Sequence, residues 1–223
     1  MSSSIVWRLI AKDLYLYRWL MGAALGVGFA SLFIPRIGDG PNNIMLILLL
    51  TSVVALGIFI GIYGIMNERK EKSLLFVLSL PISTMQYTIA KVGAALIAFL
   101  IPWAILTASI VVLTLTFDPP PDGMLPTSLT MMLFFVANFC VLITLALIAH
   151  TEFWSVAAIM ATNISVSFYM TTVPGLPGIR EHLNSPTPVW SPAILTVLGV
   201  EATVIVLSLA ALFFFQSKKK DFL

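Results

Sequence analysis

Long apolar runs, separated by short polar stretches, extend along most of the chain. A helix needs about 20 largely apolar residues to cross the hydrocarbon core of a bilayer. The pattern predicts six such helices, of which the first is the shortest and can extend back to Tyr15. The six runs cover residues 19–34, 44–66, 92–117, 127–149, 153–173 and 192–215.

The composition supports a membrane protein. The 223 residues are 59% hydrophobic and only 10% charged, whereas a soluble domain carries roughly 25% charged residues. A chain this apolar cannot cover a water-facing surface with polar groups, so lipid must surround most of it. We therefore expect an all-α integral membrane protein with a single six-span domain over residues 19–217.

The basic residues indicate how the spans are oriented. If the N-terminus is cytoplasmic, the outer loops hold only Arg36 and Arg180 of the 12 Lys and Arg residues. Lys and Arg are enriched in cytoplasmic loops. An odd number of spans would put the basic tail, residues 218–223, outside. The distribution therefore predicts six spans with both chain ends in the cytoplasm.

The N-terminal segment has two faces. Apolar residues recur at helical spacing on one face: Val6, Leu9, Ile10, Leu14 and Tyr17. Arg8, Lys12 and Tyr15 fall on another face, with Asp13 at its edge. We expect residues 1–18 to form an amphipathic helix in the inner interface, with its cations facing anionic lipid headgroups. The alternative is an extension of the first span.

Prolines mark two of the outer connections. Residues 118–126, DPPPDGMLP, form a stiff turn because consecutive prolines forbid a helix. Residues 174–192 are also proline-rich, with Gly175 and Gly178 between the prolines. This second loop is long for a simple turn, so part of it could re-enter the protein where it is shielded from lipid.

The segment between the second and third spans, residues 67–91, combines opposite properties. It is too charged at its start to lie in lipid and too apolar afterwards for a free loop. A short cytoplasmic surface helix over about residues 68–82, ended by Pro81, satisfies both. Ser83 or Thr84 can then cap a helix that runs through Gln86 and Lys91 into the third span. A surface helix of this kind suits lipid headgroups or another protein.

The order of residues in this segment is similar to that in a known family. A Glu-Arg-Lys-Glu cluster is followed by Ser-Leu-Leu, then Leu-Ser-Leu-Pro-Ile-Ser, then a Lys that opens the next span. The residues in question are Glu68, Leu74, Leu75, Leu80, Pro81, Ile82, Ser83 and Lys91. This pattern resembles the ABC-2 type permeases of ABC transporters. The Lys12–Asp13 stretch, the six-span layout and the proline-rich loop before the sixth span extend the resemblance over nearly the whole chain.

The resemblance implies a permease subunit that works with partners. We expect a separate ABC ATPase subunit that binds ATP and Mg, a second permease protomer (a homodimer is favoured), membrane lipid, and no nucleic acid. The coupling helix at about residues 68–82 would dock the ATPase. The docking residues would be Glu68, Arg69, Lys72, Leu74, Leu75, Leu78 and Pro81. Short outer loops favour export, so we expect an exporter of a peptide, drug or lipid in the bacterial cytoplasmic (inner) membrane.

Sequence motifs for chemistry are missing from the chain. It has no G-x-x-x-x-G-K-[ST], H-E-x-x-H or G-x-S-x-G sequence. We therefore expect no enzymatic activity and no cofactor bound by this chain. His150 and His182 lie on opposite sides of the membrane in the predicted topology, so they cannot share a metal. The one cysteine, Cys140, lies in an apolar run and is expected to be a packing residue.

Polar residues at membrane depth are the candidates for a substrate path. Glu201 lies about nine residues into the sixth span, where a charge costs roughly 2.5–3.5 kcal/mol. Asn138 and Asn163 are also at membrane depth. These side chains could line a substrate path or form hydrogen bonds between helices. We hypothesise that Glu201 faces the protein interior.

Two other functions compete with the exporter. An intramembrane enzyme should show a recognisable nucleophile–base or metal set within the spans, and the sequence shows none. An ion- or proton-coupled secondary transporter using Glu201 should show several intramembrane ionisable groups and internal repeats, but the chain shows one such acid and no repeat. The glycine pairs Gly22–Gly26 and Gly57–Gly61 either permit close helix contacts or occur by chance in glycine-rich spans.

Overall fold

The computed structural model describes residues 2–33, 42–66, 83–116, 121–148 and 152–218. Regular structure in these residues is helical, and the helices are α1 (Ser2–Phe33), α2 (Asn42–Gly61) with the π-helical turn η2 (Ile62–Met66), α5 (Thr84–Thr116), α6 (Met124–Ile148), α7 (Glu152–Thr172), α8 (Pro177–Arg180) and α9 (Pro192–Lys218). Six of these helices are long and apolar enough to cross a membrane. The prediction of six helices of membrane-spanning length and apolarity is therefore confirmed for the described part of the chain.

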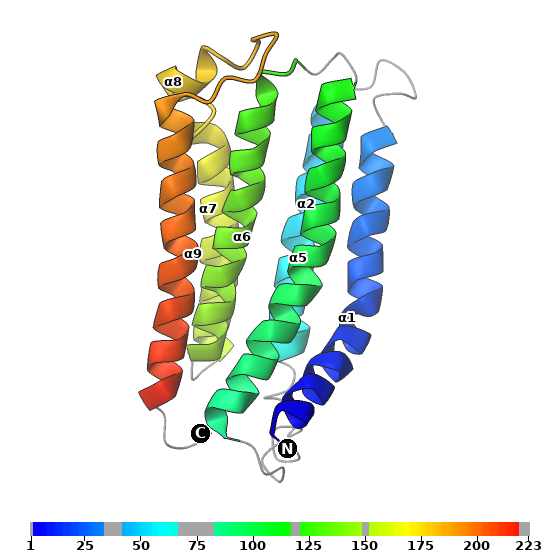
Figure 1. Ribbon diagram of the computed structural model, residues 1–223, viewed down its shortest axis with the longest axis vertical. Coiled ribbons are helices and arrows are strands. Elements are labelled where there is room, and N and C mark those ends of the chain that lie inside the picture. The colour runs from blue at the N-terminus through cyan, green and yellow to red at the C-terminus, as the bar shows by residue number, and fades with distance from the viewer. Residues whose placement is uncertain (1, 34–41, 67–82, 117–120, 149–151, 219–223) are drawn as a thin grey trace.

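The long helices run alternately up and down, and the start of α1 and the end of α9 lie at the same end of the bundle (Figure 1). We call this the terminal end, and the opposite end, which carries α8, the far end. The even number of spans agrees with this arrangement. Which end faces the cytoplasm stays a prediction from the basic residues.

The bundle consists of two groups of three helices. In one group α1 packs against α2 and α5, and in the other α6 packs against α9 and α7. The groups meet where α6 contacts α2 and α5. A hydrogen bond of 2.7 Å from Trp103 Nε1 on α5 to the carbonyl oxygen of Met132 on α6 joins them. Within the second group, Thr144 on α6 donates a 3.1 Å hydrogen bond to the carbonyl oxygen of Ser208 on α9.

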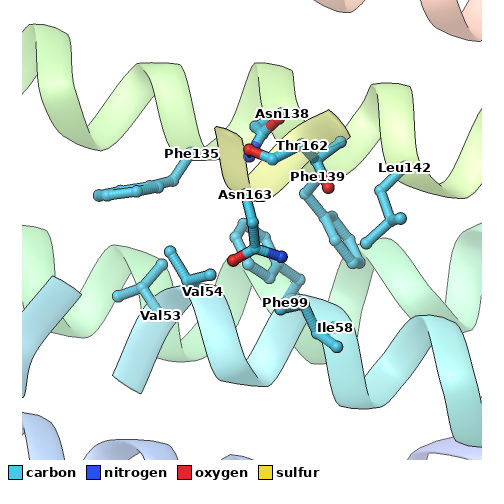
Figure 2. Close-up of a pocket in the computed structure, with 11 residues that line it drawn as sticks. Val53, Val54, Ile58, Phe99, Phe135, Asn138, Phe139, Leu142, Thr162 and Asn163 are labelled. Carbon is cyan, nitrogen blue, oxygen red and sulfur yellow. The ribbon is translucent and has the colours of Figure 1, made fainter. Parts of the chain in front are cut away.

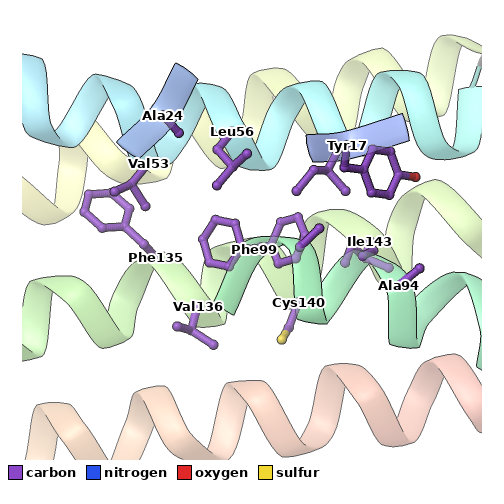
Figure 3. Packing of buried hydrophobic residues seen from close by; sticks show 14 of the residues in the cluster. Tyr17, Ala24, Val53, Leu56, Ala94, Phe99, Phe135, Val136, Cys140 and Ile143 are labelled. Atoms are coloured by element: carbon purple, nitrogen blue, oxygen red, sulfur yellow. The ribbon is translucent and has the colours of Figure 1, made fainter. Parts of the chain in front are cut away.

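The core lies where the two groups meet. The rings of Phe99 on α5 and Phe139 on α6 stack with centroids 4.0 Å apart. Figure 3 shows Phe99 among buried side chains of α1, α2, α5 and α6. A Cβ atom at Gly57 on α2 would lie 3.1 Å from the Phe139 ring. This glycine therefore lets α2 approach α6 closely. Cys140 is buried in the same cluster.

The two glycine pairs behave differently. Gly57 and Gly61 both face α6, since a Cβ at Gly61 would contact Leu142 at 3.6 Å. Nothing in the described part of the chain lies within 4 Å of a Cβ added at Gly22 or Gly26. Of the two pairs, only the α2 pair therefore makes a close helix contact among the described residues.

The N-terminal residues and the first predicted span form one continuous helix, α1, of 32 residues. The expected boundary at residue 18 is therefore not a helix break. At about 1.5 Å per residue the helix is about 48 Å long, which exceeds the hydrocarbon thickness of about 30 Å. Part of α1 must therefore tilt or extend beyond the hydrocarbon, and its exposed Trp7, Tyr15 and Trp19 are residues that suit the interface.

The position of Asp13 is a correction. The sequence pattern placed it at the edge of the basic face of α1, but the residue is only 2% exposed. It pairs with Lys91 of α5, which is distant in sequence. Helical spacing shows which residues share a face of one helix, but it does not show a partner on another helix.

Helix α5 begins at Thr84, well before the apolar run at residue 92. Ser83 caps it, because its Oγ accepts a hydrogen bond from the backbone N–H of Gln86 at 3.2 Å. In return the Ser83 backbone N–H donates to Gln86 Oε1 at 3.0 Å. This reciprocal pair is a capping box, and it confirms the prediction of a cap at this position.

The proline-rich loop 174–192 lies across the far end of the bundle (Figure 1). It contains α8, whose Ile179 is 1% exposed, and the backbone N–H of Gly123 donates a 2.9 Å hydrogen bond to the carbonyl oxygen of Ser185. The loop therefore covers the ends of helices rather than inserting between them.

Candidate functional site

The acid expected to face the interior does so. Glu201 on α9 is 4% exposed. The hydroxyl of Tyr169 on α7 donates a 2.6 Å hydrogen bond to Glu201 Oε1. The second carboxyl oxygen, Oε2, is buried and has no hydrogen-bond partner among the described residues. The hypothesis that Glu201 faces the protein interior is confirmed.

The position of Tyr169 is set by its ring. The ring stacks against Phe134 of α6 with centroids 4.0 Å apart and an interplanar angle of 21°. Tyr169 therefore bridges α6 and α9, with its apolar ring on one helix and its hydroxyl on the other. This use of both ends of the side chain is typical of partly buried tyrosines.

A cavity of about 490 Å³ lies beside this pair. Residues of α6 form its floor, and α7 and α9 form its walls. Its α9 wall consists mainly of Val197, Val200, Glu201 and Val204, of which Val200 is 58% exposed. We call this cavity the α7–α9 groove. It has the size and largely apolar lining of a small-molecule site with few polar groups.

Asn138 lines the same groove but is already hydrogen-bonded. Its Nδ2 donates to the carbonyl oxygen of Thr162 on α7 at 3.2 Å, and Ser165 Oγ donates to its Oδ1 at 3.1 Å. These bonds join α6 to α7. Asn138 therefore holds two helices together at the floor of the groove, as polar side chains do between membrane helices.

Asn163 does not reach the groove. Its Nδ2 donates to the carbonyl oxygen of Ile159, one turn earlier in α7, at 2.8 Å. The side chain lines a separate pocket of about 20 Å³ beside Val53, Val54 and Phe99 (Figure 2). A pocket of this volume has room for about one water molecule. Asn138 lines both cavities, so the structure brings it together with Glu201 in the groove and with Asn163 in the small pocket.

Tyr169 is the site residue that the sequence analysis missed. The sequence signal that could have identified it is a row of polar residues on one face of α7. Thr162, Ser165 and Tyr169 recur at helical spacing, and all three line the groove. Three polar side chains on one face of an otherwise apolar helix indicate a face that contacts protein rather than lipid.

A second polar site lies near the terminal end. Lys91 Nζ on α5 is 2.7 Å from Asp13 Oδ2 on α1, and the two side chains are 7% and 3% exposed. Lys12 Nζ forms an ion pair with Asp13 Oδ1 at 3.2 Å, although this contact lacks hydrogen-bond geometry. One turn after Asp13, Tyr17 packs against Gly64 in η2. Helix α1 therefore contacts both α5 and the end of α2.

No protein-family model, curated protein or solved structure matches the chain. Within the described residues, no three His, Cys, Asp or Glu side chains are grouped so that they could hold a metal ion. The expected docking residues between 68 and 81, and His150, lie outside the described residues. The described chain thus offers two chemical features: a carboxylate in an apolar groove at membrane depth and a buried ion pair near the terminal end.

Proposed function

We propose that the chain is the membrane-spanning permease subunit of an ATP-driven ABC exporter. A separate ATPase subunit would bind ATP and Mg, and two permease protomers would form the transport unit in the bacterial cytoplasmic membrane. The cargo would be amphipathic or lipid-like. The observation that carries this proposal is the way α1 contacts both helices that flank residues 67–82.

The first contact joins α1 to the helix after that segment. Lys91 lies two turns into α5, and its buried ion pair with Asp13 spans 2.7 Å. Charges this poorly exposed interact more strongly than charges in water, because little solvent screens them. A displacement at the start of α5 would therefore be transmitted to α1.

The second contact joins α1 to the helix before that segment. Tyr17 is 4% exposed and packs against Gly64, which lies in the π-helical turn two residues before η2 ends. Single π-helical turns occur often at functional positions. A motor subunit that moves residues 67–82 would thus act on two flanking helices that both contact α1.

ATP can drive transport only if the ATP-bound and ATP-free ATPase hold the coupling segment differently. The apolar, charged and proline positions of residues 68–82 suit such a docking segment, with Leu75 and Leu78 as its apolar contacts. The predicted topology supports the proposal further, because it puts this segment and both chain ends on the cytoplasmic side.

Co-purification tests the docking assignment. An ABC ATPase sought among the neighbouring genes is expressed with the chain. Leu75→Asp and Leu78→Asp are compared with Ser79→Asp, which adds the same charge to the same segment at a polar position. We expect the two leucine variants to lose the ATPase while their elution volume in size-exclusion chromatography is unchanged, and the serine variant to retain it. Retention of the ATPase by both leucine variants would reject the assignment.

A secondary transporter that uses Glu201 is the competing function. The buried carboxylate, with Tyr169 as its hydrogen-bond donor, favours it, because intramembrane acids often mark ion pathways. In proteoliposomes without an ATPase, a carrier would move cargo down an imposed ion gradient. Transport under these conditions would support the carrier and contradict the exporter.

A further inference from the structure

The α7–α9 groove contains a hydrogen-bond acceptor that nothing in the described chain satisfies. None of the side-chain donors that line the groove bonds to it. The Tyr169 hydroxyl donates to Glu201, Ser165 donates to Asn138, and Asn138 donates to the Thr162 carbonyl oxygen. Glu201 Oε2, by contrast, is buried without a partner. A buried carboxylate oxygen in this condition costs free energy unless a donor is supplied.

The remaining hydroxyl groups of the lining cannot supply that donor. Thr162 Oγ1 donates to backbone carbonyl oxygens of its own helix, α7. Thr196 Oγ1 donates to the carbonyl oxygen of Pro192 at 2.8 Å. A molecule that enters the groove would therefore have to bring its own donor to the carboxyl group of Glu201.

The charged groups of the groove indicate which charge the headgroup of that molecule should carry. Glu201 carries the one carboxyl group of the groove, and no Lys, Arg or His is among the residues that line it. A carboxylate or phosphate headgroup would meet no cation there and would be repelled by Glu201. An ammonium headgroup would supply both the missing donor and the opposite charge, and such charge-assisted hydrogen bonds are the stronger ones.

The shape of the groove indicates a single apolar chain. Along α6 the lining extends from Phe134 to Leu145, which is about 16 Å at the rise of an α-helix. From the level of Glu201 toward the terminal end, the lining includes Val141, Leu145 and Val204. The polar contact thus lies in the far half of the bundle, with an apolar track leading away from it.

We propose that the α7–α9 groove binds a single-chain amphiphile with a cationic ammonium headgroup, which pairs with Glu201 while its hydrocarbon tail lies along Val141, Leu145 and Val204. Only the description of this molecule as cargo rests on the proposed function. Binding itself needs no ATPase.

Photolabelling of the full chain tests the proposal directly. The protein is purified alone into phosphatidylcholine nanodiscs and labelled with a dodecylamine that carries a diazirine in its tail. We expect labelling of the α6 and α9 peptides that contain Leu145 and Val204. Unlabelled dodecylamine should compete about tenfold better than dodecanol or dodecanoate, which corresponds to about 1.4 kcal/mol. Equal competition by the three compounds would overturn the proposal.

Three variants distinguish the contact with the headgroup from the space that holds the tail. Glu201→Gln keeps an acceptor for Tyr169 but removes the charge, so labelling should fall about tenfold and the preference for the amine should vanish. Val200→Trp should block the groove, whereas Val206→Trp, at a position 65% exposed on the same helix and outside the lining, should label like the wild type. Equal labelling of the two tryptophan variants would refute the site even if Glu201→Gln failed to fold.

The ammonium group could also come from a lipid. Nanodiscs that contain phosphatidylethanolamine distinguish the two sources. Undiminished labelling would support the single-chain amine, and displacement by this lipid would overturn that assignment. Loss of amine binding would leave the docking experiment with the ATPase unaffected, so the two proposals can fail separately.

Discussion

The buried ion pair between Asp13 and Lys91 predicts a characteristic pattern of stability changes. The two side chains are 3% and 7% exposed, and the paired atoms are 2.7 Å apart. Removing one member of a buried pair costs about 3–5 kcal/mol, because the other charge stays buried. Asp13→Asn and Lys91→Met should each lower the free energy of unfolding by about this amount.

The local geometry refines this expectation. In Lys91→Met, Lys12 still lies 3.2 Å from Asp13 Oδ1, so the loss should be at the lower end of the range. In the double variant Asp13→Leu with Lys91→Met, no buried charge of the pair remains. Replacing a buried pair by apolar residues of similar volume is often neutral or stabilising. The double variant should therefore be more stable than either single variant.

Thermal unfolding in detergent, followed by size-exclusion chromatography, measures the effect. For a chain of this size, 1 kcal/mol corresponds to about 2–4 °C in Tm, so each single variant should unfold roughly 10 °C below the wild type. Lys12→Met is the control, since the Lys12 side chain is 48% exposed and such pairs contribute roughly 0–1 kcal/mol. Single variants within about 2 °C of the wild type, or a double variant no better than the singles, would show that the pair does not hold α1 to α5.

Two further predictions concern the backbone. Gly123→Ala should lower the free energy of unfolding by about 1–3 kcal/mol, because the added Cβ would lie 2.8 Å from the backbone nitrogen of Ser185. The control is Gly22→Ala, whose added Cβ meets nothing within 4 Å. Equal Tm values for the two variants would contradict the contact. Ser83→Ala should cost about 1 kcal/mol by removing the cap of α5, and unchanged Tm together with unchanged helical circular dichroism would show that the cap contributes nothing.

Hydropathy found the six long helices but misjudged where several of them begin. The third apolar run starts at residue 92, whereas α5 starts at Thr84. Hydropathy reports how residues interact with lipid, and a helix continues into polar sequence as long as its backbone is hydrogen-bonded. The start of α5 was nevertheless predictable from Ser83, because a capping residue acts on the backbone within its own turn.

Asp13 shows where such local reasoning failed. Its neighbours in sequence placed it beside Arg8 and Lys12, on the face expected to meet lipid headgroups. The side chain is instead buried, because Lys91 on another helix provides its counter-charge. No periodicity within residues 1–18 carries information about that partner.

The sequence by itself determined that this chain contains six long apolar segments, and that Glu201 in the sixth needs a partner, a proton or a wet cavity. Both follow from the cost of exposing polar groups to hydrocarbon, which depends on each residue and its near neighbours. Only the tertiary structure decided that Tyr169 is the partner of Glu201 and that the groove opens between α7 and α9. It also decided that the Gly57–Gly61 pair, rather than Gly22–Gly26, packs against another helix. These features depend on which helix faces are brought together, and that choice is made by packing between residues far apart in the chain.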